Sequence, residues 1–134
     1  MTDKIDQALG TQAAALALRV QRQQLIAANI ANADTPGYQA RDIDFRRALQ
    51  GALARVERAA DAAPAAASLP PAASRSAFAG LTTQLGTPAQ AAADANTVDM
   101  DVERARFAEN AVRYEAALKF LNGQIKTLLS AIQG

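Results

Sequence analysis

The sequence predicts an all-α fold in which long N- and C-terminal helices pair as a coiled-coil hairpin, with a flexible Ala/Pro-rich middle segment. Apolar residues recur at steps of three and four in the first part of the chain and every seven residues in the last part. The segment between them contains four of the five prolines and has no period. We therefore divide the chain into an N-terminal helix at 1–33, a turn and second helix at 34–60, a flexible low-complexity linker or insertion at 61–95, and a C-terminal heptad helix at 96–134.

The composition argues against a large globular core and against most enzyme mechanisms. Half of the 134 residues are apolar, but 35 of them are alanine and only 4% of the chain is aromatic. Small alanine side chains fill a core poorly at this chain length. The chain has no Cys and no His, which excludes a disulfide scaffold, a thiol or histidine metal site, a Cys nucleophile and an imidazole base. We expect no catalytic residue, no cofactor and no metal site.

Charge and hydropathy limit the possible partners. A net charge of +1, from 14 basic and 13 acidic residues, argues against attraction of the whole molecule to nucleic acid or anionic lipid. No apolar run approaches the roughly 18 residues that a membrane span needs. Asp3 and Asp6 precede the short apolar run Ala13–Leu18, where a secretory signal carries positive charge, so we expect no Sec signal peptide. These rules alone favour a cytoplasmic protein.

The N-terminal helix is predicted to carry one main apolar stripe, made of two adjacent rows, and a shorter second row. Gln23 interrupts the first row of the main stripe. Leu18 and Leu25 are seven residues apart and form the shorter row, which indicates either a second partner for this helix or stray surface leucines. The main stripe consists of Leu9, Leu16 and Ile30 in one row and Ala13, Val20 and Ala27 in the other.

A turn is expected where Pro36 and Gly37 follow this helix. Pro36 keeps Thr35 out of the α region and has no N–H to donate. Pro followed by Gly suits the two central positions of a type II turn, in which Gly37 takes a positive φ. Asp42 or Asp44 is expected to cap the second helix. The apolar face of that helix would consist of Phe45, Leu49, Leu53 and Val56.

The middle segment, 61–95, is rich in Ala, Ser and Thr and has few larger apolar groups. Such a segment cannot bury enough apolar surface to offset its conformational entropy, so we predict a flexible linker or a loosely packed insertion. A small β-rich insertion and short helices within the alanine runs are alternatives that the sequence leaves open.

The C-terminal segment has the most regular pattern in the chain. Thr97 or Asp99 is expected to cap it. Asn122 and Gly123 form a competing turn signal, but the apolar rows keep the same phase beyond them, so we predict one continuous helix. The two rows are Met100, Phe107, Tyr114, Leu121 and Leu128, and Ala111, Leu118, Ile125 and Ile132.

The remaining polar residues are interpreted as local or solvated. Asn29 and Asn32 are expected to cap backbone groups at the end of the first helix, and Tyr38 to pack against the bend. The arginines of the second helix alternate with acidic residues and lack stacking aromatics, which favours a solvated face over phosphate binding. Surface ion pairs are expected on the last helix between Glu103, Glu109 and Glu115 and Arg104, Arg106 and Arg113.

A two-helix hairpin leaves apolar surface uncovered, because each helix covers only one side of the other. Leu18, Leu25, Val102 and Val112 lie off the main rows, so we expect other subunits to complete the core and the monomer to be partly unfolded. The predicted assembly seam consists of Leu9, Leu16, Val20, Ile30, Met100, Phe107, Ala111, Tyr114, Leu118, Leu121, Ile125, Leu128 and Ile132.

The pattern fits a second class of function nearly as well, and a third class much less well. A soluble helical-hairpin adaptor or secretion chaperone would bind by inserting a helix into a groove. An enzyme could work only through carboxylates, such as Asp42 and Asp44.

The stretch from Ala28 to Phe45 resembles the N-terminal signature of the axial proteins of the bacterial flagellum, in which Asn-x-x-Asn is followed by Thr-Pro-Gly and an aromatic residue. The stretch from Asn96 to Gly134 is similar to the proximal rod members of that family. The residues that carry the N-terminal motif are Asn29, Asn32, Thr35, Pro36, Gly37 and Tyr38.

The resemblance implies a structural protein without catalytic activity. It implies export through the flagellar type III apparatus without a cleaved signal, and self-assembly through the terminal helices into the periplasmic rod that transmits torque. The implied partners are other copies of the chain, other rod proteins, the adaptor FliE between the membrane ring and the rod, and the export gate, with no nucleic acid and no small-molecule substrate. The implied location, the flagellar basal body, replaces the cytoplasmic expectation.

Overall fold

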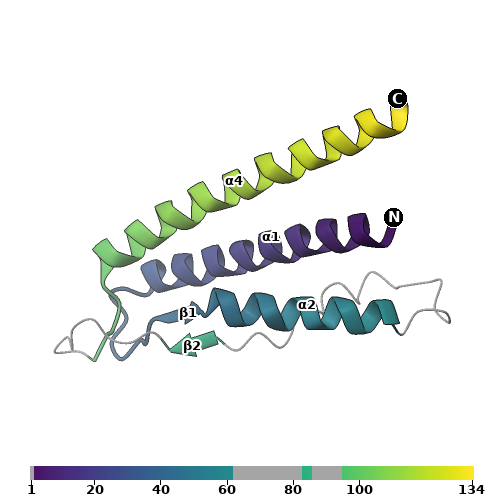
Figure 1. Cartoon of the computed structure of the whole chain (residues 1–134). Coiled ribbons are helices and arrows are strands. Elements are labelled where there is room, and N and C mark those ends of the chain that lie inside the picture. Colours follow the sequence, from purple (N-terminus) through teal and green to yellow (C-terminus); the bar gives the residue numbers. More distant parts are fainter. Residues whose placement is uncertain (1, 62–82, 86–94) are drawn as a thin grey trace.

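Three helices and two short strands make up the described part of the chain, which a computed structural model gives for residues 2–61, 83–85 and 95–134. Helix α1 lies between α2 and α4 (Figure 1). The predicted helical fold with long terminal helices is confirmed. The predicted linker at 61–95 lies outside the described residues except for 61, 83–85 and 95. The elements are α1 (Thr2–Ala31), β1 (Arg41–Ile43), α2 (Phe45–Asp61), β2 (Thr83–Leu85) and α4 (Met100–Gln133).

The chain turns sharply after α1, as the Pro-Gly pair predicts. The backbone N–H of Tyr38 donates to the carbonyl of Thr35 at 3.2 Å, which closes a four-residue turn with Pro36 and Gly37 at its centre. Gly37 has a φ of 72°. The predicted positive φ is therefore confirmed, and the turn sends the chain back along α1.

Helix α2 begins at Phe45 because Asp44 caps it. The Asp44 side chain accepts from the backbone N–H of Arg47 at 3.2 Å, and its carbonyl accepts from Ala48 at 2.9 Å. Of the two predicted caps, the structure selects Asp44. Asp42 lies instead in strand β1.

Strand β1 is an element that the sequence patterns do not predict. It pairs antiparallel with β2, with Asp42 opposite Gln84 at the centre of the ladder. Each strand has three residues, which is too short for a period of two to be recognised. The pairing brings 83–85, from within the predicted linker, alongside the end of the turn.

Helix α4 is continuous over 34 residues, or about 51 Å at 1.5 Å per residue. Asp99 caps it by accepting from the backbone N–H groups of Asp101 and Val102. The helix passes through Asn122 and Gly123 without interruption. The predictions of a cap at this position and of one unbroken helix are both confirmed.

The buried apolar side chains gather around α1 and the strand–helix segment that follows it. Leu18 is 0% exposed and lies one turn before Arg22, which binds Asp42, so Leu18 is on the side of α1 that faces β1 and α2. The interpretation of Leu18 as surplus surface is therefore wrong, whereas a second partner for α1 is correct. Val102 and Val112 are exposed, as expected. The buried apolar residues are Ala14, Leu18, Ile26, Ala40, Ile43 and Ala52.

Replacing Leu18 by alanine should destabilise the folded chain by about 2–5 kcal/mol, because it removes a buried side chain and leaves a cavity. Val112→Ala is the matched control, since Val112 is 68% exposed, and it should change stability by no more than about 0.5 kcal/mol. Denaturation followed by circular dichroism, at a concentration where helicity has reached its plateau, measures both. Equal effects of the two changes would contradict the placement of Leu18.

Gly37→Ala and Gly51→Ala should change stability in opposite directions. A Cβ added at either position meets no atom within 4 Å, so backbone conformation alone decides whether alanine stabilises or destabilises the fold. At Gly37 the positive φ should make alanine destabilising by about 1–2 kcal/mol, whereas in the interior of α2 alanine should be stabilising by about 0.5–1 kcal/mol. The same denaturation experiment measures the two signs, and stabilisation by Gly37→Ala would rule out the strained turn.

Candidate functional site

Asn29, the first residue of the predicted motif, joins three segments of the chain. Its side chain is 1% exposed. The amide nitrogen donates to the carbonyl of Arg41 at 2.7 Å and to Oε2 of Glu103 at 3.0 Å. The amide oxygen accepts from the backbone N–H of Arg41 at 3.0 Å and from the Tyr38 hydroxyl at 3.4 Å. The expectation of a purely local cap is therefore wrong for Asn29, because its side chain links α1 to β1 and to α4.

Asn32 and Thr35 do act locally, as expected. The amide nitrogen of Asn32 donates at 2.8 Å to the carbonyl of Ala28 in the last turn of α1, which also accepts from the backbone N–H of Asn32 at 3.1 Å. The Thr35 hydroxyl donates to the amide oxygen of Asn32 at 3.2 Å. These two bonds hold the end of the helix against the turn.

Asn96 and Thr97, which precede α4, close the same turn from the other end of the sequence. The amide nitrogen of Asn96 lies 2.7–3.0 Å from the carbonyls of Asn32, Ala33 and Thr35, and its side chain is buried. Thr97 donates its backbone N–H to Tyr38 and accepts from the backbone N–H of Ala40 with its hydroxyl. Sequence reasoning missed both roles, because a contact across more than 50 residues leaves no periodic signal.

Glu103 is buried beneath this turn, and its interpretation as a surface ion-pairing residue is wrong. It is 2% exposed. One carboxylate oxygen accepts from Arg106 at 2.9 Å and the other from Asn29 at 3.0 Å. A buried carboxylate is stable only when paired and hydrogen-bonded, and both conditions are met. We call Asn29, Asn32, Thr35, Asn96, Thr97 and Glu103 the polar joint.

The two carboxylates considered for catalysis both have structural partners. Asp42 binds the Arg22 guanidinium through two bonds, at 2.9 and 3.0 Å. This hydrogen-bonded pair raises the pKa of Arg22 above its ordinary value. Asp44 caps α2. The Arg22–Asp42 pair therefore ties β1 to the middle of α1.

A second polar contact joins α1 and α4, nearer the middle of their interface than the Asn29–Glu103 bond. The amide nitrogen of Asn110 donates to the carbonyl of Arg19 at 2.9 Å and to Oε1 of Gln23 at 2.6 Å. Asn110 is 1% exposed, and its amide oxygen has no hydrogen-bond partner within the described part of the chain. The Gln23 that interrupts the predicted row is thus matched by a buried amide on α4, an arrangement that fixes helix register in coiled coils.

Arg19 lies on α1, between α2 and α4. Its guanidinium stacks over the Phe45 ring, 4.5 Å from the ring centre. Burial, and then the nearby charges of Arg113 and Arg22, lower the pKa of Arg19 below its ordinary value.

The predicted assembly seam lies along α1 and α4 but is not buried within the chain. The buried residues of α4 are Glu103 and Asn110, which belong to neither predicted row. Val20, Phe107, Ile125 and Ile132 are exposed. The other seam residues are half-buried: Leu9, Leu16, Ile30, Met100, Ala111, Tyr114, Leu118, Leu121 and Leu128.

Part of the seam borders a groove of about 510 Å³ between the middle parts of α1 and α4. We call it the mid-helix groove. Its apolar walls include Val20 of α1 and Leu118 of α4. The lining residues are Arg19, Val20, Gln23, Gln24, Asn110, Ala111, Tyr114, Glu115 and Leu118.

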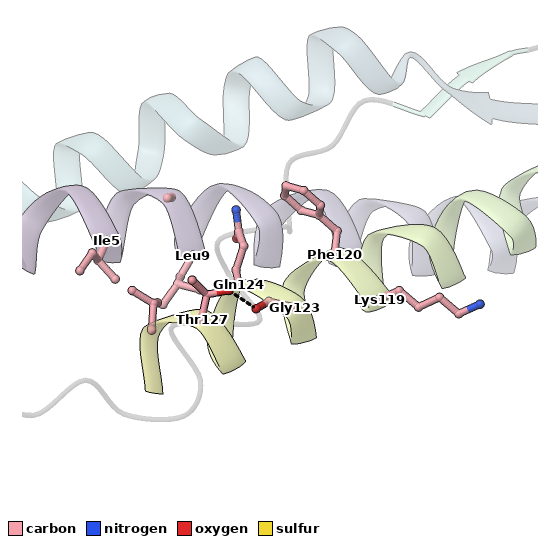
Figure 2. Close-up of a pocket in the computed structure, with 9 residues that line it drawn as sticks. Ile5, Leu9, Lys119, Phe120, Gly123, Gln124 and Thr127 are labelled. Carbon is pink, nitrogen blue, oxygen red and sulfur yellow. Dashed lines mark hydrogen bonds between the residues drawn. The ribbon is translucent and has the colours of Figure 1, made fainter. Parts of the chain in front are cut away.

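A second groove, of about 600 Å³, lies between the start of α1 and the last part of α4. Figure 2 shows Ile5 and Leu9 extending from α1 toward α4, and Phe120 and Gln124 extending from α4 toward α1. Thr127 bonds to the carbonyl of Gly123 beside them. We call this the end groove, and it is apolar apart from Lys119 and the polar groups of Gln124 and Thr127.

The described ranges contain neither a metal-binding cluster nor a membrane-spanning helix. Residues 2–61, 83–85 and 95–134 contain no group of three or more acidic, His or Cys side chains placed to hold a metal ion. Among the helices described, none combines the length and apolar character needed to cross a bilayer.

Asn96→Asp should destabilise the fold by about 2–4 kcal/mol, because the three facing carbonyls lose their donor and meet a buried carboxylate instead. Gln50→Glu, the same amide-to-carboxylate change at an exposed position of α2, should have an effect within about 0.5 kcal/mol. Thermal unfolding followed by circular dichroism compares the two variants. A small effect at Asn96 would show that the polar joint is not closed as described.

Comparison with known proteins agrees with the motif. The model of the flagella basal body rod protein family matches residues 9–39, which include the end of α1 and the turn. The flagellar basal body rod protein FlgB of Escherichia coli (strain K12) is 46% identical over 143 aligned residues, covering 99% of this chain and 98% of that protein. FlgB of Salmonella typhimurium is 45% identical, with 100% and 99% covered. FlgB of Cereibacter sphaeroides is 42% identical, also with 100% and 99% covered.

These relatives align along nearly the whole chain, so the likeness extends beyond residues 9–39 to the part of the chain that forms α4. The chain belongs to the FlgB family of flagellar basal body rod proteins.

Proposed function

We propose that this structural rod component is a subunit of the proximal rod, that it polymerises through its terminal helices, and that the assembled rod transmits torque. Family membership supports the rod component. The observation that supports polymerisation is the exposed apolar surface along α4, where Phe107, Ile125 and Ile132 face solvent in the isolated chain. Large apolar patches on a soluble surface mark interaction sites.

The route to the rod is part of the same proposal. We propose that the chain passes through the flagellar type III export apparatus without a cleaved signal peptide. A subunit that folds only when neighbours cover its apolar rows would suit a narrow export channel.

The proposed partners are those that an axial subunit needs. They are other copies of this chain, other rod proteins, the adaptor FliE and the export gate. The exposed rows on α4 and the two grooves are surfaces to which helices of such partners could bind. The alternative function, a helical-hairpin adaptor or secretion chaperone, would use similar surfaces, but relatives that match over the whole length favour the rod.

Leu118→Asp should leave expression intact but stop rod assembly, because it places a charge in the apolar wall of the mid-helix groove. The measurement is swimming in soft agar, together with isolation of basal bodies, in a strain that carries the variant as its only copy. Swimming equal to that of the unmodified strain would contradict assembly through this surface.

Val112→Asp is the matched control, since it adds the same charge to the same helix at a residue that is 68% exposed and outside both grooves. We expect this variant to swim. Loss of swimming with both changes would contradict the assignment of the assembly surface to the groove side of α4.

A further inference from the structure

Asn122 and Gly123 form a reactive pair that the rod function does not use. This is the one place in the chain where glycine follows asparagine. Both residues are exposed on α4. The other asparagines each donate their amide nitrogen to a backbone carbonyl within the chain: Asn29, Asn32, Asn96 and Asn110. The Asn122 amide is thus accessible to water, and the next backbone nitrogen belongs to a residue without a Cβ.

An asparagine followed by glycine can lose its side-chain amide through a cyclic imide. The backbone nitrogen of Gly123 attacks Cγ of Asn122, and glycine favours this step because it has no Cβ to hinder the approach. The N–Cγ bond forms and the Cγ–Nδ2 bond breaks. The side-chain nitrogen leaves as ammonia, together with the proton that the Gly123 nitrogen gives up. Water then opens the imide at one of its two carbonyls, which yields aspartate or isoaspartate and a new negative charge.

Helix α4 opposes this reaction while it is intact. In an α-helix the N–H of residue 123 donates to the carbonyl four residues before it. The helical ψ of about −42° also turns the Gly123 nitrogen away from the Asn122 side chain, whereas closure of the five-membered ring requires the two to meet. The ring can therefore close only in copies whose helix has opened locally, so the open fraction sets the rate at which Asn122 is lost.

The surroundings of the pair favour local opening in the isolated chain. Glycine weakens a helix interior, and a Cβ added at Gly123 would meet no atom within 4 Å, so the backbone is not tightly packed there. Ile125, Leu129 and Ile132, which follow on α4, are 39%, 50% and 82% exposed. Segments with few buried apolar contacts open at low cost. Neighbouring copies that cover these side chains would lower the open fraction.

We propose that Asn122 is a deamidation site, that α4 suppresses its reaction, and that the suppression is strongest in assembled copies. The proposal rests on the proposed function, because neighbours in the rod supply the added protection. Isoaspartate lengthens the main chain by one carbon atom within residue 122, which interrupts the helical hydrogen bonds and shifts Ile125 and Ile132 out of their row. Copies that wait unassembled thus lose their apolar surface, whereas copies in the rod keep it.

The test measures the loss of Asn122 over time at mildly alkaline pH, by mass spectrometry of peptides from the full-length chain. Three samples are compared: the chain unfolded in guanidinium chloride, the native chain at low concentration, and the native chain at high concentration. Loss should be at least roughly tenfold slower in the concentrated native sample than in denaturant, because about one tenth or less of the helix is then open. The dilute sample should fall between the two. Sedimentation and circular dichroism record association and helicity in the same samples.

Gly123→Ala is the matched control, since the added Cβ meets no atom within 4 Å in the folded chain. In denaturant, where the helix plays no part, this change should slow the loss of Asn122 severalfold because alanine hinders the attacking nitrogen. Asn110 is an internal reference, because it precedes Ala111. It should remain largely intact in denaturant while Asn122 reacts.

Equal rates of Asn122 loss in denaturant and in the concentrated native chain would overturn the proposal. Loss of Asn110 as fast as that of Asn122 in denaturant would overturn it too. Equal rates in dilute and concentrated samples that differ in association would overturn protection by assembly. A chain that sediments as a monomer at every concentration would contradict the proposed function instead, and the comparison with denaturant would still decide whether α4 protects Asn122.

Discussion

Within the described part of the chain, helix α4 packs closely against one other helix, on one side only. Helix α1 lies between α2 and α4 and is covered from two directions, whereas the one extensive contact of α4 with another described element is with α1 (Figure 1). A helix covered on one side can hide only one strip of its surface. As a result, most of the large apolar side chains that are exposed in the described part of the chain belong to α4: Val102, Phe107, Val112, Phe120, Ile125, Leu129 and Ile132. In the described part of the chain, this topology leaves apolar surface of α4 exposed, and this is the surface that we propose for binding other chains.

The polar joint determines where that surface lies. Asn29 and Asn96 use amides, which both donate and accept, to satisfy backbone groups that the turn leaves without partners. Glu103 receives a bond from Asn29, so the start of α4 is held against the end of α1. Because the joint fixes the two helices at one end, the register of their whole length follows from it. The Asn110–Gln23 contact supports the same register nearer the middle.

Periodicity and capping rules predict the elements of this fold better than its contacts. The rows of α4, the cap at Asp99 and the positive φ of Gly37 could all be predicted, because each depends on residues within a few positions of one another. Strands β1 and β2 could not, since three residues form no period. The burial of Glu103 was missed because its partner Asn29 lies 74 residues away. The sequence carries one hint that the interface between α1 and α4 contains polar groups. Gln23 interrupts an apolar row of α1, and in the structure it accepts a hydrogen bond from Asn110 of α4.

The central claim is that the chain cannot cover its own helices and becomes fully ordered only with neighbours. Far-ultraviolet circular dichroism and sedimentation of one sample, diluted from high to low micromolar concentration, test it directly. The account predicts that helicity falls as the oligomers dissociate and that the melting temperature rises with concentration. A compact monomer that melts cooperatively at low micromolar concentration, at a temperature independent of dilution, would contradict it.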